Sequence, residues 1–234
     1  MTAGAVARRS GRMATGVRGG LRRDGDQTRE RLLDAAEALF AAQGFHGTSM
    51  RDVAGAMDCG IALVKYHCGT KELLFDAVVE RRAADMAAYR TQALDAALAQ
   101  AGGRPLAVEA LVSGYVWPFI ERSRAGDAGW RNYSLFVARH ANAPEFSKVL
   151  GKHYDPVARR YLAEFARSLP ALPSSDLFYA FSFMVGTMVS TVAQPGRLEQ
   201  LSKRRIRAAD VEVAFQRMLP FLSAGFKSLV PRRP

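Results

Sequence analysis

The chain has 234 residues, of which 49% are hydrophobic and 24% are charged. It is therefore long enough to bury a sizeable core, in one large domain or in a small domain joined to a larger one. No apolar run approaches the roughly 18 residues that span a membrane, and the Arg-rich N-terminus lacks the apolar region of a secretory signal. Two cysteines do not make a disulfide framework and are typical of a reducing compartment. These features exclude a disulfide-rich secreted protein, and we expect a cytoplasmic one.

The net charge of +11 favours a nucleic-acid partner, but the charge is unevenly distributed. Residues 1–23 carry six Arg and no acidic residue, whereas residues 24–77 carry nine acidic and five basic residues. Residues 101–234 carry nineteen basic and ten acidic residues. Net charge alone therefore does not locate a nucleic-acid site, and the argument must rest on motifs.

Residues 1–25 show no hydrophobic period and contain many Gly, so we expect a disordered basic arm. Two interpretations stay open for this segment. It is either a solvated tail or an arm that reaches the DNA backbone or minor groove and gains counterion-release energy there.

The first strong helical pattern follows the arm. Apolar residues at helical spacing predict a helix from Thr28 to Gln43, with Thr28 as its N-cap and Gly44 just beyond its C-terminus. Ser49 and Asp52 then resemble a capping box and begin a short helix.

A tight corner and two further helices complete this region. The corner is Asp58-Cys59-Gly60, and a second short helix runs from Ile61 to His67. A long helix without internal Gly or Pro then spans residues 71–101. Two short helices around a corner are typical of a helix-turn-helix, whose second helix enters the major groove of DNA.

The side chains that we expect to contact DNA lie at the helix starts and on the outer face of the second short helix. Hydroxyls and helix N-termini suit phosphates, and Lys, Tyr, His and small apolar side chains suit phosphates or base edges. The predicted contact residues are Thr48, Ser49, Arg51, Gly60, Ile61, Ala62, Lys65, Tyr66, His67 and Lys71.

These motifs resemble a known family. Residues 28–54 read TRERLLDAAEALFAAQGFHGTSMRDVA and residues 62–74 read ALVKYHCGTKELL. This order is similar to the DNA-binding domain of the TetR family of bacterial transcriptional regulators over residues 28–80. The chain departs from the family's pattern at the corner, where Gly60 lacks the usual Ser hydroxyl, at Cys68, where Phe is usual, and at Lys65, where Tyr is usual.

The resemblance implies an all-α protein in two parts, with an N-terminal three-helix DNA-binding domain joined by a long helix to a C-terminal helical bundle. We expect the basic arm at 1–25, the DNA-binding domain at 26–86 with its helix-turn-helix at about 49–68, and an effector-binding and dimerisation domain at 87–234. The residues after the long helix predict helices at 105–124, 129–141, 144–168, 174–194 and 208–229, with a kink at Pro118 and a break near Asp155-Pro156.

Aromatic side chains beside Pro118 and on the next helix predict an effector pocket. The expected lining residues are Tyr115, Trp117, Phe119, Tyr133, Phe136, Val137, His140, Phe181 and Met184. The same residues also fit an ordinary helical core, and both interpretations stay open. Arg131, Arg139 and His140 are candidates to meet an anionic effector, or are solvated.

The last two long helices are apolar on more faces than one partner helix needs. We expect a two-fold interface of two helices from each subunit, against the alternative of core within one chain. The expected interface residues are Phe178, Val185, Met188, Val192, Phe215, Met218, Leu222 and Phe226.

Cys59, His67 and Cys68 admit a metal-binding or redox role, but a pair of small core side chains and a phosphate-facing His is the simpler interpretation. We expect no metal, no cofactor and no enzymatic activity, since no nucleophile–base pair or Gly-rich phosphate loop is present.

The sequence thus predicts a homodimeric, ligand-responsive regulator that binds double-stranded DNA at a pseudo-palindromic operator. It would be a repressor that a small apolar or amphipathic effector releases, with no membrane partner. The alternatives are a helical ligand-binding or scaffold protein that has lost operator binding, and an all-helical enzyme.

Overall fold

Helices account for the regular structure of residues 14–124, 126, 128–193, 196–207 and 209–231, which are the residues that the computed structural model describes. No strand occurs among them, as the sequence predicts. The helices are α1 (Ala14–Gly47), α2 (Met50–Ala56), α3 (Ile61–Cys68), α4 (Lys71–Ala101), α5 (Val108–Arg124), α6 (Ala128–His140), the 3-10 turn η1 (Pro144–Phe146), α7 (Ser147–Ser168), α8 (Ser174–Ala193), α9 (Arg197–Leu201) and α10 (Val211–Ser228).

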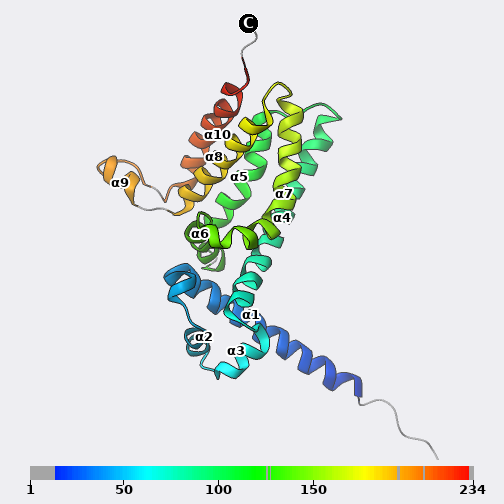
Figure 1. Ribbon diagram of the computed structural model, residues 1–234, viewed down its shortest axis with the longest axis vertical. Coiled ribbons are helices and arrows are strands. Elements are labelled where there is room, and N and C mark those ends of the chain that lie inside the picture. The colour runs from blue at the N-terminus through cyan, green and yellow to red at the C-terminus, as the bar shows by residue number, and fades with distance from the viewer. Residues whose placement is uncertain (1–13, 125, 127, 194–195, 208, 232–234) are drawn as a thin grey trace, which may run out of the picture.

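The chain forms a small head, α1 to α3 with the start of α4, below a larger body that contains α5 to α10 (Figure 1). The long helix α4 runs from the head into the body, where it packs against α5 and α7. One hydrophobic core continues through both parts and includes buried residues of α1, α4 and α6. The two parts are therefore packed together as well as linked by α4.

Local caps fix the helices of the head. The Ser49 hydroxyl accepts the backbone N–H of Asp52 at 3.2 Å, and the Asp52 carboxylate accepts that of Ser49 at 2.7 Å. These hydrogen bonds hold the pKa of Asp52 below its usual value, and they confirm the predicted capping box. At the start of α4, the Thr70 hydroxyl accepts the Leu73 N–H at 3.3 Å.

Two expectations for the first helix need correction. The helix begins at Ala14 rather than Thr28, and residues 14–27 contain no Pro that would interrupt it. Residues 14–25 are therefore helical and not a disordered arm, while residues 1–13 of that predicted arm lie outside the described residues. Near its other end, α1 leaves helical geometry at Gly44, whose φ of 78° suits glycine, as the sequence predicts.

The body follows the predicted helices closely, with one addition. The chain forms the short helix α9, which the sequence analysis missed because a five-residue helix has no measurable period. The break expected near Asp155-Pro156 is also wrong. Helix α7 continues through Pro156, as α5 does through Pro118.

Head and body meet where α1 packs on α6. The Phe75 ring on α4 lies 5.0 Å from the Phe136 ring and 4.6 Å from the Phe146 ring. The backbone N–H of Phe45 donates to His140 Nε2 at 3.2 Å, and the His140 Nδ1–H donates to the Phe136 carbonyl at 2.8 Å. This hydrogen-bond chain joins the end of α1 to the last turn of α6.

Among the described helices, α8 is long and apolar enough to span a membrane by length and composition. That finding corrects the sequence expectation that no such segment is present. A core helix of a globular domain passes the same test, and one side of α8 packs against α5, α6, α7 and α10. The opposite side carries exposed aromatic residues, which raises the question of what covers them.

Candidate DNA-binding face and effector cavity

Helix α3 presents an exposed outer face at the lower end of the molecule (Figure 1). Its apolar residues Val64 and Cys68 point into the head, whereas Lys65 and Tyr66 point outward. The Tyr66 side chain is 84% exposed, which is unusual for a large aromatic residue and leaves it available to a partner. Of the other predicted DNA contacts, Ser49, Arg51, Gly60, Ile61 and Ala62 are exposed and His67 is half-buried.

Two predicted DNA contacts have internal partners instead. Thr48 is buried, and its hydroxyl donates to the Gly44 carbonyl at 2.9 Å. Lys71 donates from Nζ to the carbonyls of Phe45 and Thr48, each at 3.0 Å, and lies 4.2 Å from the centre of the Phe45 ring. Both side chains stabilise the C-terminal end of α1. The last carbonyls of a helix have no donor within the helix, and these side chains supply donors for them.

Three acidic residues of α1 form ion pairs with α4 inside the head. Arg81 of α4 contacts carboxylates of Glu30, Asp34 and Glu37 at 3.1, 2.9 and 3.1 Å. Arg82 holds the same Glu37 through two hydrogen bonds of 2.9 and 3.0 Å. Three acidic residues of the head therefore lie at the contact of α1 with α4, and α3 itself has no acidic residue.

The two cysteines have separate environments in the head. Cys59 is half-buried, and Cys68 is buried. Burial raises the pKa of the Cys68 thiol, which disfavours the reactive thiolate form. Among the residues that the structure describes, no group of three His, Cys, Asp or Glu side chains is placed to hold a metal ion.

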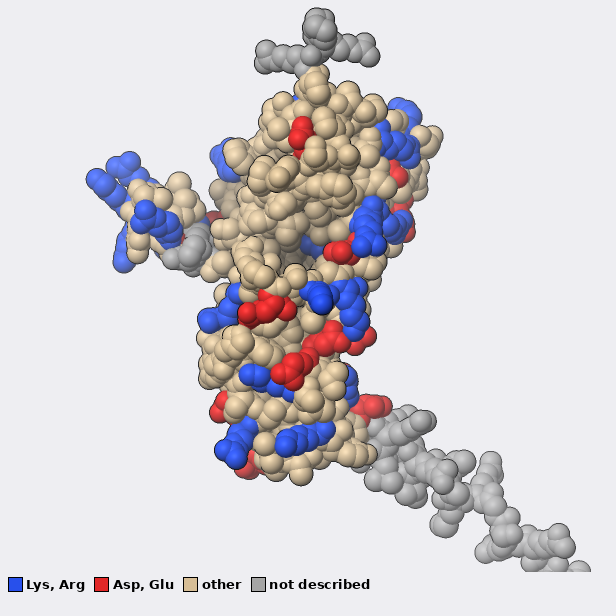
Figure 2. All heavy atoms as spheres, viewed as in Figure 1, with Lys and Arg blue, Asp and Glu red and all other residues tan. Residues whose placement is uncertain are grey.

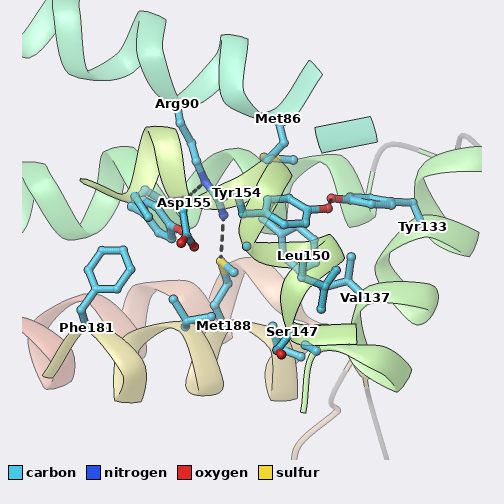
Figure 3. Close-up of a pocket in the computed structure, with 17 residues that line it drawn as sticks. Met86, Arg90, Tyr133, Val137, Ser147, Leu150, Tyr154, Asp155, Phe181 and Met188 are labelled. Atoms are coloured by element: carbon cyan, nitrogen blue, oxygen red, sulfur yellow. Dashed lines mark hydrogen bonds between the residues drawn. The ribbon is translucent and has the colours of Figure 1, made fainter. Parts of the chain in front are cut away.

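A cavity of about 300 Å³ opens between helices α4 to α8 of the body (Figure 3). Five predicted pocket residues line it, namely Tyr115, Phe119, Tyr133, Val137 and Phe181. Its wall is mostly apolar with a few polar groups, which is typical of a small-molecule site. The further lining residues are Met86, Arg90, Ala141, Ser147, Leu150, Gly151, Tyr154, Asp155, Ala158, Val185, Met188 and Val189.

Four predicted pocket residues lie outside the cavity wall. Trp117 packs on Phe215 of α10, with ring centres 4.8 Å apart. Phe136 and His140 face the head, because they sit on the side of α6 that contacts α1 and α4. Met184 is fully buried in the core.

The charged groups of the cavity differ from those expected. Arg131 and Arg139 are exposed, and Arg139 lies beside Gly44 at the head. The basic residue in the cavity wall is Arg90 of α4, which sequence analysis missed. A signal for it exists, because Arg90 lies four residues from both Met86 and Leu94 on the buried stripe of α4.

Two tyrosine hydroxyls meet at the cavity wall. Tyr133 of α6 and Tyr154 of α7 form a hydrogen bond through their hydroxyl oxygens (Figure 3). Burial raises the pKa of both phenols, so both stay neutral. Two hydroxyls contain two hydrogens and use one between them, which leaves one donor for another acceptor.

Two family models match the chain in its two parts. The model described as "Bacterial regulatory proteins, tetR family" matches residues 32–78, and the model described as "Tetracyclin repressor-like, C-terminal domain" matches residues 113–225. The chain belongs to the TetR family. It is accordingly a DNA-binding transcriptional regulator, with its DNA-binding domain at the N-terminus and a helical domain after it.

Solved structures of other regulators share this fold at low sequence identity. GusR of Salmonella enterica is 21% identical, with 87% of this chain and 95% of that chain covered and a TM-score of 0.56. The ketosteroid regulator KstR2 of Mycobacterium tuberculosis is 18% identical (88% and 96% covered, TM-score 0.56). FadR of Bacillus subtilis is 15% identical (84% and 98% covered, TM-score 0.56). No curated protein matches the chain in a sequence search.

The TetR-family chain exposes an apolar face on α8 and α10, and this face differs from the predicted interface. Phe178 is exposed as expected, but Met188, Val192, Met218, Leu222 and Phe226 are buried and Val185 and Phe215 are half-buried. The residues that actually face outward are Tyr179, Phe183 and Phe221, and Phe221 is 72% exposed. In Figure 2 the upper part of the visible face, over α8 and α10, carries few charged residues.

Proposed function

We propose that the protein is a homodimeric repressor whose α3 helices read two half-sites of an operator, and that a small effector in the body cavity releases it. The observation that carries the DNA-binding part is the outer face of α3. It exposes Lys65 and Tyr66, has no acidic residue, and lies away from the ion pairs that Arg81 and Arg82 make with α1. Such a face suits both phosphates and base edges.

Selection of duplexes from a random pool tests this proposal. It should return sites with two inverted half-sites about one helical turn apart. On such a site, Lys65→Ala and Tyr66→Ala should each weaken binding by roughly 1–3 kcal/mol. Lys148→Ala, an exposed Lys on α7, serves as the matched control and should leave affinity unchanged. Binding without a steep salt dependence would instead favour a scaffold that no longer binds DNA.

The homodimer is proposed from the apolar face of α8 and α10. Phe178, Phe183 and Phe221 are exposed there, and a groove of about 570 Å³ runs between the two helices. Large exposed apolar patches mark interaction sites, and a second copy packed on this face would give two heads for two half-sites. Phe183→Glu or Phe221→Glu should give monomers in sedimentation experiments, whereas Leu135→Glu, at an exposed apolar residue of α6, should not.

Effector coupling is proposed from the position of α6 and α7. Tyr133 and Val137 of α6 line the cavity, while Phe136 and His140 of the same helix contact the head. On α7, Tyr154 lines the cavity and its neighbour His153 contacts Asp76 of α4 at 2.7 Å. A ligand that moves these helices shifts the population of head positions and so the DNA affinity. The relative FadR was solved in complex with stearoyl-CoA.

A cavity-filling variant tests this coupling without a known effector. Val137→Trp places a large ring in the cavity and should change operator affinity severalfold while the fold is kept. Leu135→Trp, on the exposed side of the same helix, is the control. Equal operator affinities of the two variants would count against coupling through α6. We also propose that the protein acts in the cytoplasm and by binding rather than by catalysis.

A further inference from the structure

The most unusual side chain of the cavity is Arg90. It is only 2% exposed, yet its guanidinium lies at the cavity wall (Figure 3). Its Nε donates to the Tyr115 carbonyl at 2.9 Å, and its Nη2 donates to the Met188 sulfur at 3.4 Å. The guanidinium carbon also lies 3.8 Å from the centre of the Tyr115 ring. A carbonyl, a weak sulfur acceptor and a ring face leave its positive charge without a counter-ion.

Two other arginines of the same helix have a carboxylate counter-ion. Arg81 and Arg82 lie two to three turns earlier on α4 and share the buried carboxylate of Glu37. In the part of the chain that the structure describes, no Asp or Glu forms an ion pair with Arg90, and no hydrogen bond joins its Nη1 to another residue. Buried charges are normally paired, so Arg90 is prepared for an anion from outside the chain.

The rest of the wall indicates the shape of that anion. Around Arg90 lie apolar side chains of four helices, among them Met86, Phe119, Leu150 and Phe181. A planar carboxylate matches the guanidinium fork, and an apolar body matches the remaining wall. At about 300 Å³, the cavity lies at the lower end of small-molecule sites, which favours a small acid over a bulky conjugate.

Asp155 is the acidic residue of the lining, and it constrains the ligand further. Its side chain is 54% exposed and pairs with Arg159 at 3.5 Å, so its charge is largely met by solvent and by α7 itself. The negative charge of Asp155 would repel a simple anion weakly. It would instead attract a ligand that carries an ammonium group as well as a carboxylate, and this difference separates the two ligand classes.

We propose that the effector is a small amphiphilic carboxylic acid whose carboxylate binds the Arg90 guanidinium and whose apolar part fills the cavity. This inference rests on the proposed function only in that the cavity is the effector site. The free hydrogen of the Tyr133–Tyr154 pair serves a further oxygen of the ligand, if it has one. The carboxylate replaces the missing counter-ion, so binding gains from a charge that the fold has already buried.

Calorimetry on the full chain, without DNA, tests the proposal with matched probes. Octanoate and 4-phenylbutyrate are compared with octanamide and 4-phenylbutyramide, which have the same apolar bodies and no charge. Each acid should bind roughly 10- to 100-fold more tightly than its amide, as expected for hydrogen bonds to a charged group. Equal affinities within each pair, or no binding by either acid, would overturn the proposal.

Variants locate the effect. Arg90→Met replaces the guanidinium with an unbranched apolar side chain and should reduce the acid-to-amide ratio to about one, and Arg90→Lys should give an intermediate ratio. Asp155→Asn should strengthen acid binding severalfold, because a repulsive charge is removed. Two results would overturn the proposal and point to a zwitterionic ligand instead. One is weaker binding of the acid to Asp155→Asn than to the wild type, and the other is tighter binding of 2-aminooctanoate than of octanoate to the wild type. The comparison of acids with amides on the wild type decides the matter even if an Arg90 variant fails to fold.

Operator binding separates this inference from the proposed function. An acid that binds through Arg90 but leaves DNA affinity unchanged would remove the proposed repressor mechanism and leave the ligand assignment standing. A neutral amphiphile that releases the operator as effectively as the matching acid would support the proposed repressor mechanism and remove the assignment of an acid as the ligand.

Discussion

Two places in the molecule bury charge, and they do so in opposite ways. At the contact of α1 with α4, Glu37 is only 1% exposed and accepts three hydrogen bonds from Arg81 and Arg82. At the cavity, Arg90 is equally buried but meets no carboxylate of the described chain. In the first arrangement both arginines have a carboxylate counter-ion, and these ion pairs join α1 to α4. In the second the arginine has none among the described residues, and this difference separates a structural charge from one kept for a ligand.

The largest expected effect comes from breaking the ion pairs of Glu37. Glu37→Met should lower the free energy of unfolding by about 3 kcal/mol, because it removes the buried carboxylate that both Arg81 and Arg82 contact. Glu30→Met removes an exposed carboxylate from the same Arg81 and should cost less than about 1 kcal/mol. Urea unfolding followed by circular dichroism measures both, and similar losses would mean that burial does not decide the strength of these pairs.

The next effect tests the end of α1. Lys71→Met removes the two hydrogen bonds to the carbonyls of Phe45 and Thr48 and should cost about 2 kcal/mol of stability. The exposed Lys148→Met is the control, with a change near zero. If Lys71→Met instead weakens DNA binding while the unfolding midpoint stays where it was, Lys71 is a phosphate contact, as the sequence alone predicts.

A smaller effect comes from His140 at the same junction. Burial lowers the pKa of His140 below its usual value of about 6.5, and its Nε2 must stay unprotonated to accept the Phe45 N–H. The unfolded chain therefore binds a proton that the folded chain excludes, and stability falls as the pH drops through about 6.5 and below. The slope should approach 1.4 kcal/mol per pH unit at most. His140→Asn should flatten the curve of unfolding free energy between pH 7.5 and 5.5, and an unaltered slope would speak against this assignment.

The smallest effect is expected at the cavity. Arg90→Met exchanges a buried charge without a counter-ion for an unbranched apolar side chain, so stability should change by less than about 1 kcal/mol or rise. Thermal unfolding of Arg90→Met beside Glu37→Met compares the two buried charges directly. A loss as large as that of Glu37→Met would show that Arg90 is also part of the structural framework.

Local signals account for what the sequence predicted well. The capping box at Ser49, the corner before α3 and the ends of α4 depend on residues within one or two turns of each other. The roles of Thr48 and Lys71 depend instead on where α1 ends in space. A hydroxyl or ammonium beside a DNA-binding helix looks the same in sequence whether it faces a phosphate or a carbonyl.

The body shows the limit of periodicity more clearly. Spacing alone placed Tyr115, Tyr133 and Val137 on the correct helical faces, but it did not show that Tyr154 and Arg90 complete the same wall. Helix α8 is apolar on several sides, so its sequence does not separate a buried Met188 from an exposed Phe183. Only the packing of five helices around one space decides which side chains meet there.

The length of α4 sets the scale of the switch. A continuous helix of 31 residues measures about 46 Å, and a tilt of roughly 5° moves one end by about 4 Å relative to the other. Half-sites lie some 34–36 Å apart along the duplex, and a displacement of that size in each head is enough to misplace hydrogen bonds to base edges. A small acid that tilts α4 slightly in the body would thus displace the head by several times as much as it displaces the helix at the cavity. No part of the head would need to unfold or detach.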